Sequence, residues 1–514
     1  MRRPTLVSAP AATSNARHVL QDSRGGHLEA LAIAAISGAA LVTRLPHVLA
    51  SSLPVGDGGL FYLMARGLSE TFPRIPTTVS YGSTDVPTAY PPLGFFVAVA
   101  ADWLGPWDLT DVFRFLPLTF SVLSVLAAWL VLRELCPWPR SVLALALLAL
   151  IPRSWNWEVV GGGITRSPGL FFLLLALSQA VKMGQGRGGR LLPLWTALAL
   201  LFHPEMGLMA LVHPFFFAVV LTERRNKGGA LLQAAMAAAV AIVLSAPWWG
   251  YALARHGPET LLGAATGSRY SPQTTAVIML LPFSYGEPGL PWLALLGLLG
   301  VLGLAVRRDF LAGGWLLFLF LVDPRKAATV ATLPLALGAA WLVGQAATAL
   351  GQRWPRVAPA VIAAVLTVGV VGSLEADRAL NTPLRALASR DVAAMVWIRD
   401  NTAPDSRVLV LAGLPWATDP ASEWLPAVAR RESVLTVQGS EWLGKEVFWQ
   451  RSRMANDAAR CLREGTCSGG ELAARFGADL VLLYSGCDCP RATEGLEPLL
   501  PGSVYVPSPP VPGR

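Results

Sequence analysis

The sequence is poor in charge: only 14% of its 514 residues are Asp, Glu, Lys or Arg, against about a quarter in an ordinary soluble domain. This scarcity excludes a soluble enzyme, and the abundance of apolar residues excludes a disordered chain. Hydrophobic residues make up 53% of the chain, and its mean hydropathy is +0.49. Apolar runs of roughly 18 to 24 residues match the thickness of a bilayer core. We therefore expect a polytopic membrane protein that contacts the lipid bilayer directly.

Acidic residues are scarce chiefly in the first part of the chain. Residues 1–374 carry 26 basic and 16 acidic side chains, whereas residues 375–514 carry 15 and 17. The net charge of +8 therefore belongs to the apolar part, where membrane topology explains it better than a nucleic-acid partner does. We expect no nucleic-acid partner. Lysine is also rare, with four Lys beside 37 Arg, a bias that favours a GC-rich bacterial genome.

Cysteine is rare and unevenly placed. Cys136 stands alone near an apolar segment, and the other four lie in the last 60 residues, at Cys461, Cys467, Cys487 and Cys489. An even number in a polar region predicts two disulfides in an oxidising compartment. A four-thiolate metal site is the alternative, although these spacings lack paired CxxC motifs.

Eleven apolar segments predict the transmembrane helices. They lie at about 28–45, 113–132, 141–152, 167–181, 191–202, 206–222, 229–253, 288–306, 310–322, 327–350 and 357–374. The first 27 residues have no apolar core, so we expect a cytoplasmic N-terminal segment followed by a signal anchor. Every loop predicted on the cytoplasmic side is then short and basic, and the odd number of spans places the C-terminal region outside. The short pair 191–202 and 206–222 has an alternative as broken or re-entrant helices.

The first loop predicted on the outside, residues 46–111, is far longer than an ordinary connection, and long ordered loops tend to be functional. Asp57 lies among glycines in Val55-Gly-Asp-Gly-Gly59, where they let the backbone turn tightly just before a helix. The apolar face expected for this helix is Leu60, Leu63, Met64 and Leu68. Further on, Tyr90-Pro-Pro-Leu93 leads into an apolar stretch that ends near Leu104. We interpret this stretch as an interfacial helix, because a span here would invert the charge pattern downstream.

Several of these features together resemble the GT-C superfamily of membrane glycosyltransferases. They are the signal anchor, the Asp close behind it, the Tyr90-Pro-Pro-Leu93 segment and the Arg114-Phe-Leu-Pro-Leu118 start of the next helix. Oligosaccharyltransferase catalytic subunits, protein O-mannosyltransferases and aminoarabinose transferases belong to this superfamily. The resemblance covers the architecture of residues 28–374. It implies transfer of a sugar from a polyprenyl-phosphate or polyprenyl-diphosphate donor to a lipid, glycan or protein acceptor outside the membrane.

The resemblance also assigns site residues. The first-loop acid of the superfamily corresponds to Asp57, which we predict to be the catalytic base, and a second acid corresponds to Glu158. The alternatives are a helix N-cap for Asp57 and, for Glu158, an interfacial ion pair with Arg153 or Arg166. A divalent cation such as Mg²⁺ or Mn²⁺ remains open as a cofactor, with these two acids as its ligands. Asp57 is followed by Gly58 rather than by a second acid, and no clear Asp-x-Asp motif follows the third span.

The chemistry of the implied reaction fits this assignment, because glycosyl transfer needs a carboxylate for the acceptor's proton and cations for the leaving phosphate. We predict Arg325, Lys326 and Arg269 to bind the donor phosphate. For Arg325, an ion pair with Asp323 or snorkelling to the headgroups is the alternative. The remaining candidates for the substrate pocket are Tyr90, Arg166, His203, Glu205 and Tyr270.

The same candidates have other, purely structural explanations. His203-Pro-Glu205 also fits a kinked helical hairpin, and the loop with Arg269 and Tyr270 fits an ordinary solvated loop rather than a lid.

The glycine run Gly161–Gly163 is a further candidate for phosphate binding, because its backbone N–H groups suit a phosphate at the start of a helix.

The composition changes at about residue 375. Charges become frequent, and alternating helical and strand patterns predict a small α/β domain over residues 375–497, with one of its helices over about 440–463. A loose Pro- and Ser-rich tail is expected to follow over 498–514. The whole sequence favours an inverting GT-C glycosyltransferase of a bacterial plasma membrane. A polytopic transporter or a lipid or glycan flippase is the alternative, although most charges lie at helix ends and no internal repeat is evident.

Overall fold

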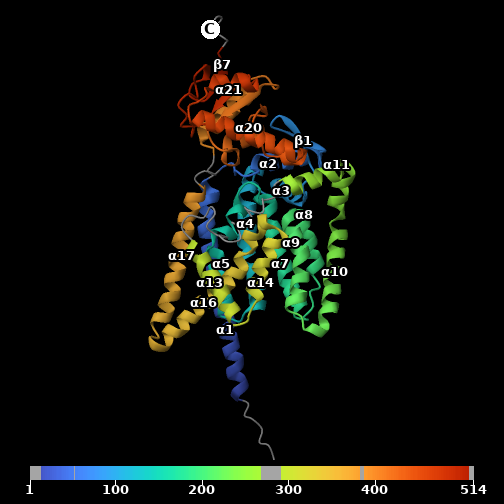
Figure 1. Ribbon diagram of the computed structural model, residues 1–514, viewed down its shortest axis with the longest axis vertical. Helices are drawn as coiled ribbons and strands as arrows, with labels where there is room; N and C mark the ends of the chain where they lie inside the picture. The colour runs from blue at the N-terminus through green and yellow to red at the C-terminus, as the bar shows by residue number, and fades with distance from the viewer. Residues whose placement is uncertain (1–12, 51, 268–290, 382–386, 509–514) are drawn as a thin grey trace, which may run out of the picture.

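The computed structural model describes residues 13–50, 52–267, 291–381 and 387–508. Its larger part is a bundle of long apolar helices, and a mixed α/β region stands at one end (Figure 1). The bundle helices are α1 (Thr13–Ala50), α4 (Leu109–Leu135), α5 (Arg140–Leu150), α7 (Gly163–Gly184), α8 (Leu192–Phe202), α9 (Pro204–Val220), α10 (Lys227–Leu244), α13 (Pro291–Val306), α14 (Leu311–Val322), α16 (Thr332–Arg353) and α17 (Val357–Asn381).

Each of the eleven segments expected to be apolar helices forms one, which confirms a helical, polytopic membrane fold. Within the described residues, six helices are long and apolar enough to cross a membrane: those within 26–50, 109–135, 163–184, 224–244, 327–353 and 357–375. The others are shorter. The segment expected over 229–253 ends earlier, because α10 stops at Leu244 and α11 (Ala246–Gly267) begins a new direction.

Small residues bring the bundle helices close together. A Cβ on Gly300 of α13 would collide with the backbone of Gly338 in α16, so these two helices pack with their backbones in contact. Such close approach is typical of membrane helices, where van der Waals contact replaces the hydrophobic driving force. The helices α4 and α7 form another extensive contact, with α1, α5, α8 and α9 around them.

The long segment between α1 and α4 is ordered. It forms α2 (Gly58–Thr71), the antiparallel hairpin of β1 (Thr78–Tyr81) and β2 (Thr84–Pro87), and α3 (Leu93–Leu104). The apolar face expected for the first of these helices is buried at Leu60, Met64 and Leu68, whereas Leu63 is only partly buried. This segment packs against α4 and α7, and it lies at the end of the bundle that carries the α/β region (Figure 1).

The C-terminal α/β region, residues 389–507, contains a five-stranded sheet in the order β4-β3-β5-β7-β6. Its strands are β3 (Arg407–Leu411), β4 (Glu432–Ser433), β5 (Leu480–Leu483), β6 (Leu496–Leu500) and β7 (Val504–Pro507). Its helices are α18 (Ser389–Asn401), α19 (Pro420–Val428), α20 (Lys445–Arg463) and α21 (Gly469–Phe476). The central strand β3 is parallel to β4 and β5, whereas β7 is antiparallel to β5.

Two expectations for this region were wrong in detail. Residues 498–507 are not a loose tail, because β6 and β7 pair as a hairpin and complete the sheet. The prolines of this stretch suggested a loose tail, but they occupy positions where a missing N–H is tolerated. Pro498 lies in the edge strand β6, and Pro507 is the last residue of β7. The helix expected over 440–463 is interrupted at Gly444, whose φ of 112° no helix accommodates.

The four C-terminal cysteines form two disulfides, Cys461–Cys467 and Cys487–Cys489. The structure therefore holds disulfides in place of a four-thiolate metal site. Cys136 is buried and free at the end of α4.

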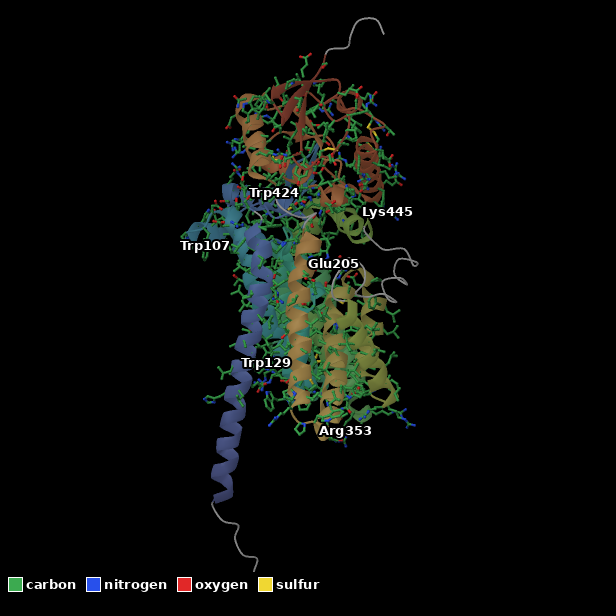
Figure 2. All side chains as sticks on the ribbon, turned by 90° about the vertical axis from the view of Figure 1, so that its left-hand side faces the viewer. Trp107, Trp129, Glu205, Arg353, Trp424 and Lys445 are labelled. Atoms are coloured by element: carbon green, nitrogen blue, oxygen red, sulfur yellow. A yellow bond between two sulfur atoms is a disulfide. The ribbon has the colours of Figure 1, made fainter. Side chains whose placement is uncertain are left out.

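The two ends of the bundle differ in what they carry. Figure 2 shows Trp424 where the C-terminal α/β region meets the bundle, and Glu205 at the same end of the helices. Arg353 lies at the opposite end, which is where α1 extends away from the bundle. The helix α2 contacts both α19 and α4, so the segment that begins at Asp57 lies between the C-terminal α/β region and the bundle.

Candidate functional site

Asp57 lies at the N-terminus of α2, in a left-handed backbone conformation with φ 74°. Asp is one of the few residues other than Gly that tolerate this conformation. Its carbonyl oxygen accepts the first helical hydrogen bond, from the N–H of Phe61 at 3.0 Å. Its carboxylate makes no capping hydrogen bond to the helix, so the side chain does not serve as the N-cap considered as its alternative role. The carboxylate is available for other chemistry.

The carboxylate of Asp57 forms an ion pair with the guanidinium of Arg166, on the first turns of α7. The Asp57 side chain is 34% exposed and that of Arg166 only 12%. A second guanidinium nitrogen of Arg166 donates to the carbonyl oxygen of Trp157 at 3.4 Å. The arrangement presents a reachable carboxylate beside a fixed cation, a combination that suits a proton acceptor next to an anionic leaving group.

Two glycine-rich segments fix this geometry. The N–H of Gly161 donates to the carbonyl of Val55 at 2.7 Å, and the N–H of Gly162 donates to Gly56 at 2.6 Å. The two backbones approach so closely that a Cβ on Gly161 would collide with Gly58. The expectation that the glycine run offers free N–H groups to a phosphate was wrong, because backbone carbonyls already accept them. Pairing with the Asp57 loop is the role of these glycines.

Glu158 lies on the short helix α6 (Asn156–Val159), just before the glycine run, and its side chain is fully buried. Val160, two residues later, packs on the backbone of Gly56. The fold therefore brings the segment of Glu158 against the loop of Asp57. Arg166, considered as the partner of Glu158, forms its ion pair with Asp57.

Tyr90 connects several of the predicted site residues. The hydroxyl of Thr165 donates to the Tyr90 hydroxyl at 3.4 Å, and the ring of His203 lies 6.1 Å from the ring of Tyr90. Burial raises the pKa of Tyr90 above its usual value, and the negative charges of Glu205 and Asp57 raise it further, while Arg166 opposes them. These interactions place Tyr90 within electrostatic range of all three charged groups, so the fold brings most of the predicted site together.

His203 and Glu205 lie where α8 ends and α9 begins. His203 is buried, and its ring nitrogen Nδ1 accepts the N–H of Met206 at 3.5 Å, as an N-cap of α9. This capping corresponds to the structural alternative for His203-Pro-Glu205. The ring of His203 also contacts that of Tyr90, and the charge of Glu205 raises the pKa of Tyr90.

The predicted phosphate ligands lie outside the described parts of the structure. Arg269 and Tyr270 fall within 268–290, which the structure does not describe, and the same holds for the side chains of Arg325 and Lys326. The backbone of the latter two belongs to α15 (Pro324–Val330). This helix contacts the turn Pro152–Ser154, shortly before Glu158, so it borders the site.

Glu423 is the site residue that sequence analysis missed. It lies in α19 of the C-terminal α/β region, is fully buried, and accepts the N–H of Gly56 at 2.9 Å. Burial raises its pKa to about 8, the charge of Asp57 adds to this effect, and the N–H groups of the Asp57 loop oppose it. An acid in the first turn of a helix is ordinary. Nothing local in the sequence links it to Asp57.

The described residues do not fit a resident metal ion. They contain no group of three or more His, Cys, Asp or Glu side chains arranged to hold one. Asp57, the first expected ligand, forms its ion pair with the guanidinium of Arg166.

Comparison with known proteins supports the fold. No protein family model and no curated protein matches the sequence. The archaeal oligosaccharyltransferase AglB from Archaeoglobus fulgidus, solved with an inhibitory peptide and a dolichol-phosphate, is similar in structure with a TM-score of 0.53. The two sequences are 13% identical, and the match covers 89% of this chain and 69% of AglB. The Archaeoglobus fulgidus enzyme has also been solved in complex with Zn and sulfate.

Two further structures give the same result. ArnT from Cupriavidus metallidurans, bound to undecaprenyl phosphate, has a TM-score of 0.50 at 15% identity, over 82% of this chain and 88% of ArnT. The arabinofuranosyltransferase AftD from Mycobacteria has a TM-score of 0.51 at 15% identity, over 93% of this chain but 40% of AftD. All three have the GT-C fold, so the fold expected from the sequence is confirmed.

Proposed function

We propose that the protein is a membrane glycosyltransferase that moves a sugar from a polyprenyl-phosphate or polyprenyl-diphosphate donor to a hydroxyl of a lipid, glycan or protein acceptor. The observation that carries this proposal is the partly exposed Asp57 carboxylate, paired with Arg166 at the end of a GT-C bundle. The similar structures support a lipid carrier, since AglB was solved with dolichol-phosphate and ArnT with undecaprenyl phosphate.

The proposed reaction is a single displacement. Asp57 takes the proton of the acceptor hydroxyl, whose oxygen forms a bond to the anomeric carbon of the sugar. The bond from that carbon to the phosphate oxygen breaks, and its electron pair leaves with the polyprenyl phosphate. One displacement inverts the anomeric carbon.

Cations near Asp57 stabilise the leaving group. When Asp57 takes the proton it loses its negative charge and no longer forms an ion pair with Arg166. The guanidinium of Arg166 can then pair with the departing phosphate instead. Arg325, Lys326 and Arg269 are the further phosphate ligands that we propose, and the backbone of α15 borders the site as this role requires. Glu158 is buried next to the Asp57 loop and serves as the second acid.

The proposed location is a bacterial plasma membrane, with the N-terminus in the cytoplasm and the C-terminal α/β region outside. Basic loops at the end of the bundle that carries Arg353 support this orientation, because Lys and Arg favour the cytoplasmic side. The donor phosphate and the acceptor then meet at the outer surface, beside Asp57.

Donor consumption tests the proposal. Purified protein in lipid is offered a panel of polyprenyl-phosphate and polyprenyl-diphosphate sugars with mixed acceptor extracts, and release of the polyprenyl phosphate or diphosphate is measured. We expect wild type to release it from one donor, and Asp57→Asn to lose about 100-fold or more, as when a general base is removed. Asp85→Asn is the matched control, since Asp85 is an exposed carboxylate of the same 46–111 segment, and we expect wild-type release.

Two results would contradict parts of the proposal. Unchanged release by Asp57→Asn removes Asp57 from the mechanism. If folded wild type releases nothing from any donor, the enzyme class is wrong, and flux assays for a transporter or flippase become the next measurement.

A further inference from the structure

The carboxylate of Glu423 spans the loop that carries Asp57. Its Oε2 accepts the N–H of Gly56 at 2.9 Å, and its Oε1 accepts the N–H of Gly59 at 3.3 Å. Gly56 precedes Asp57 and Gly59 follows it by two residues. Between these two bonds the chain passes through positive φ at both Gly56 and Asp57, a backbone conformation that needs support from its surroundings.

The neighbours of Glu423 strengthen the same contact. The carbonyl oxygen of Glu423 accepts a bond from the hydroxyl of Tyr81 at 2.6 Å, and the indole N–H of Trp424 donates to the carbonyl of Pro54 at 3.0 Å. A Cβ on Gly59 would collide with the carbonyl oxygen of Glu423. Gly59 thus allows α19 to lie directly on the start of α2.

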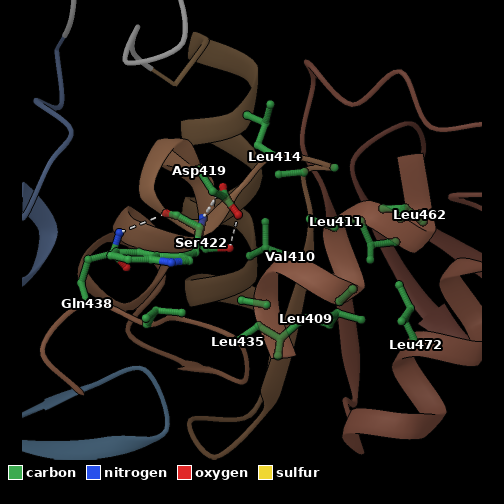
Figure 3. A pocket seen from close by; sticks show the side chains of 17 residues that line it. Leu409, Val410, Leu411, Leu414, Asp419, Ser422, Leu435, Gln438, Leu462 and Leu472 are labelled. Atoms are coloured by element: carbon green, nitrogen blue, oxygen red, sulfur yellow. Dashed lines mark hydrogen bonds between the residues drawn. The ribbon is translucent and has the colours of Figure 1, made fainter. Parts of the chain in front are cut away.

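Glu423 is itself firmly held within the C-terminal α/β region. Asp419 caps α19 by accepting the N–H groups of Ala421 and Ser422, both at 3.0 Å. The side-chain amide of Gln438 lies within 3.4 Å of the Glu423 carboxylate. Figure 3 shows Asp419, Ser422 and Gln438 together beside a cavity under the carboxyl end of β3. At about 30 Å³ this cavity is too small for a sugar, so it is not a second sugar site.

We propose that Glu423 is a positioning residue for Asp57, supplied by the C-terminal α/β region to the catalytic loop of the membrane bundle. The proposal rests on the function proposed above for Asp57. Glu423 is fully buried and so does not meet the substrate. It acts by accepting two N–H groups of the loop, which fixes the left-handed turn and aims the Asp57 carboxylate at Arg166. The α/β region is therefore part of the catalytic unit rather than an appended module.

The test compares Glu423→Ala, which removes both acceptors, with Glu423→Gln, which keeps one oxygen. Glu432→Gln is the matched control, because Glu432 belongs to the same region but pairs with Arg407 at 3.2 Å. Amide hydrogen exchange is measured on the full-length protein in lipid, for peptides covering 54–62. The kcat and KM are measured with whichever polyprenyl-linked sugar wild type consumes.

We expect Glu423→Ala to exchange about tenfold faster over 54–62, because buried N–H groups lose their acceptor. We expect its kcat to fall at least about tenfold with KM for the donor within about twofold, since misaligned catalytic groups lower turnover rather than binding. Glu423→Gln should recover part of both effects, and Glu432→Gln should behave as wild type.

The outcomes separate the two proposals. Wild-type exchange over 54–62 in Glu423→Ala overturns the positioning role, whatever the activity. Faster exchange with unchanged kcat also overturns it, since the loop would then need no fixing for turnover. Wild type that consumes no donor overturns the proposed function instead, and the exchange experiment still decides whether Glu423 holds the loop.

Discussion

At the scale of single residues, the site depends on one left-handed aspartate and the groups that hold it. Asp57 has Arg166 on one side and, through the backbone, Glu423 on the other. The two carboxylates lie close enough for the charge of Asp57 to raise the pKa of Glu423 beyond the effect of burial. Arg166 offsets the charge of Asp57. The cluster thus keeps a carboxylate exposed for chemistry while its support is buried.

The raised pKa of Glu423 predicts a pH dependence of stability. The pKa lies at about 8 in the folded protein, against 4.5 for an unperturbed glutamate, so the folded state binds a proton more tightly than the unfolded state. The stabilisation is therefore complete below about pH 4.5 and is lost as pH rises to about 8. We expect the apparent unfolding temperature of wild type in lipid to fall over this range.

Glu423→Gln isolates this contribution, because the amide does not titrate. The variant should lose the part of the decline that falls between pH 4.5 and 8, so its unfolding temperature should depend less on pH than that of wild type. Parallel curves for the two proteins would contradict a raised pKa for Glu423. Glu432→Gln again serves as the control, with a curve like that of wild type.

At the scale of elements, two helices from distant parts of the chain meet at glycines. The start of α2 lies on α19, and a Cβ on Gly58 would come within 3.1 Å of the Trp424 ring. The two residues just before α7, Gly161 and Gly162, donate their N–H groups to backbone carbonyls of the same loop. The sequence indicates Gly58 as a neighbour of Asp57 and the run with Gly161 and Gly162 as a candidate phosphate loop, but the main contribution of these glycines is the close approach of three segments.

This close approach makes Gly59→Ala a sharp test of the α2–α19 contact. The added Cβ would collide with the backbone of Glu423, which cannot move aside as a flexible side chain can. We expect a loss of about 1 to 3 kcal/mol in stability, as in other overpacked sites, and a loss of donor consumption. Thermal unfolding and the donor assay measure the two effects.

Gly344→Ala is the matched control for this substitution. Gly344 lies within α16, and a Cβ there would meet nothing within 4 Å, so we expect equal or slightly higher stability, since Ala favours helix more than Gly does. Equal stability of Gly59→Ala and wild type would mean that α19 does not rest on α2.

At the scale of the whole molecule, a membrane bundle and a sheet-containing region share one site. The described hydrogen bonds from Glu423 and Trp424 join the C-terminal α/β region to the segment between α1 and α4. Both disulfides belong to that region. Under the proposed function, sugar transfer takes place on the side of the membrane on which this region lies.

Thiol labelling tests this orientation. In a Cys136→Ser background, which removes the free cysteine, we expect a membrane-impermeant maleimide to leave the protein unlabelled in intact cells that express it. After an impermeant reductant is added, the four C-terminal cysteines should become labelled, because they lie outside and are oxidised. Labelling before reduction would contradict the disulfides, and protection after reduction would contradict the outward orientation.

The sequence by itself determined the class of protein and most of its helices. Hydropathy over about 20 residues is a local property, so the eleven apolar segments were visible without any tertiary information. Asp57 stood out for the same reason, since its glycine neighbours and the helix after it are adjacent in the chain.

Only the tertiary structure decided the partners of Asp57 and its loop. Arg166, which pairs with Asp57, lies 109 residues away in the sequence, and Glu423 accepts the N–H of Gly56 across 367 residues. No composition or periodicity encodes such pairs, because they arise from packing two folded units against each other. The hairpin of β6 and β7 has the same explanation, since only pairing with β5 turns that proline-rich stretch into a sheet.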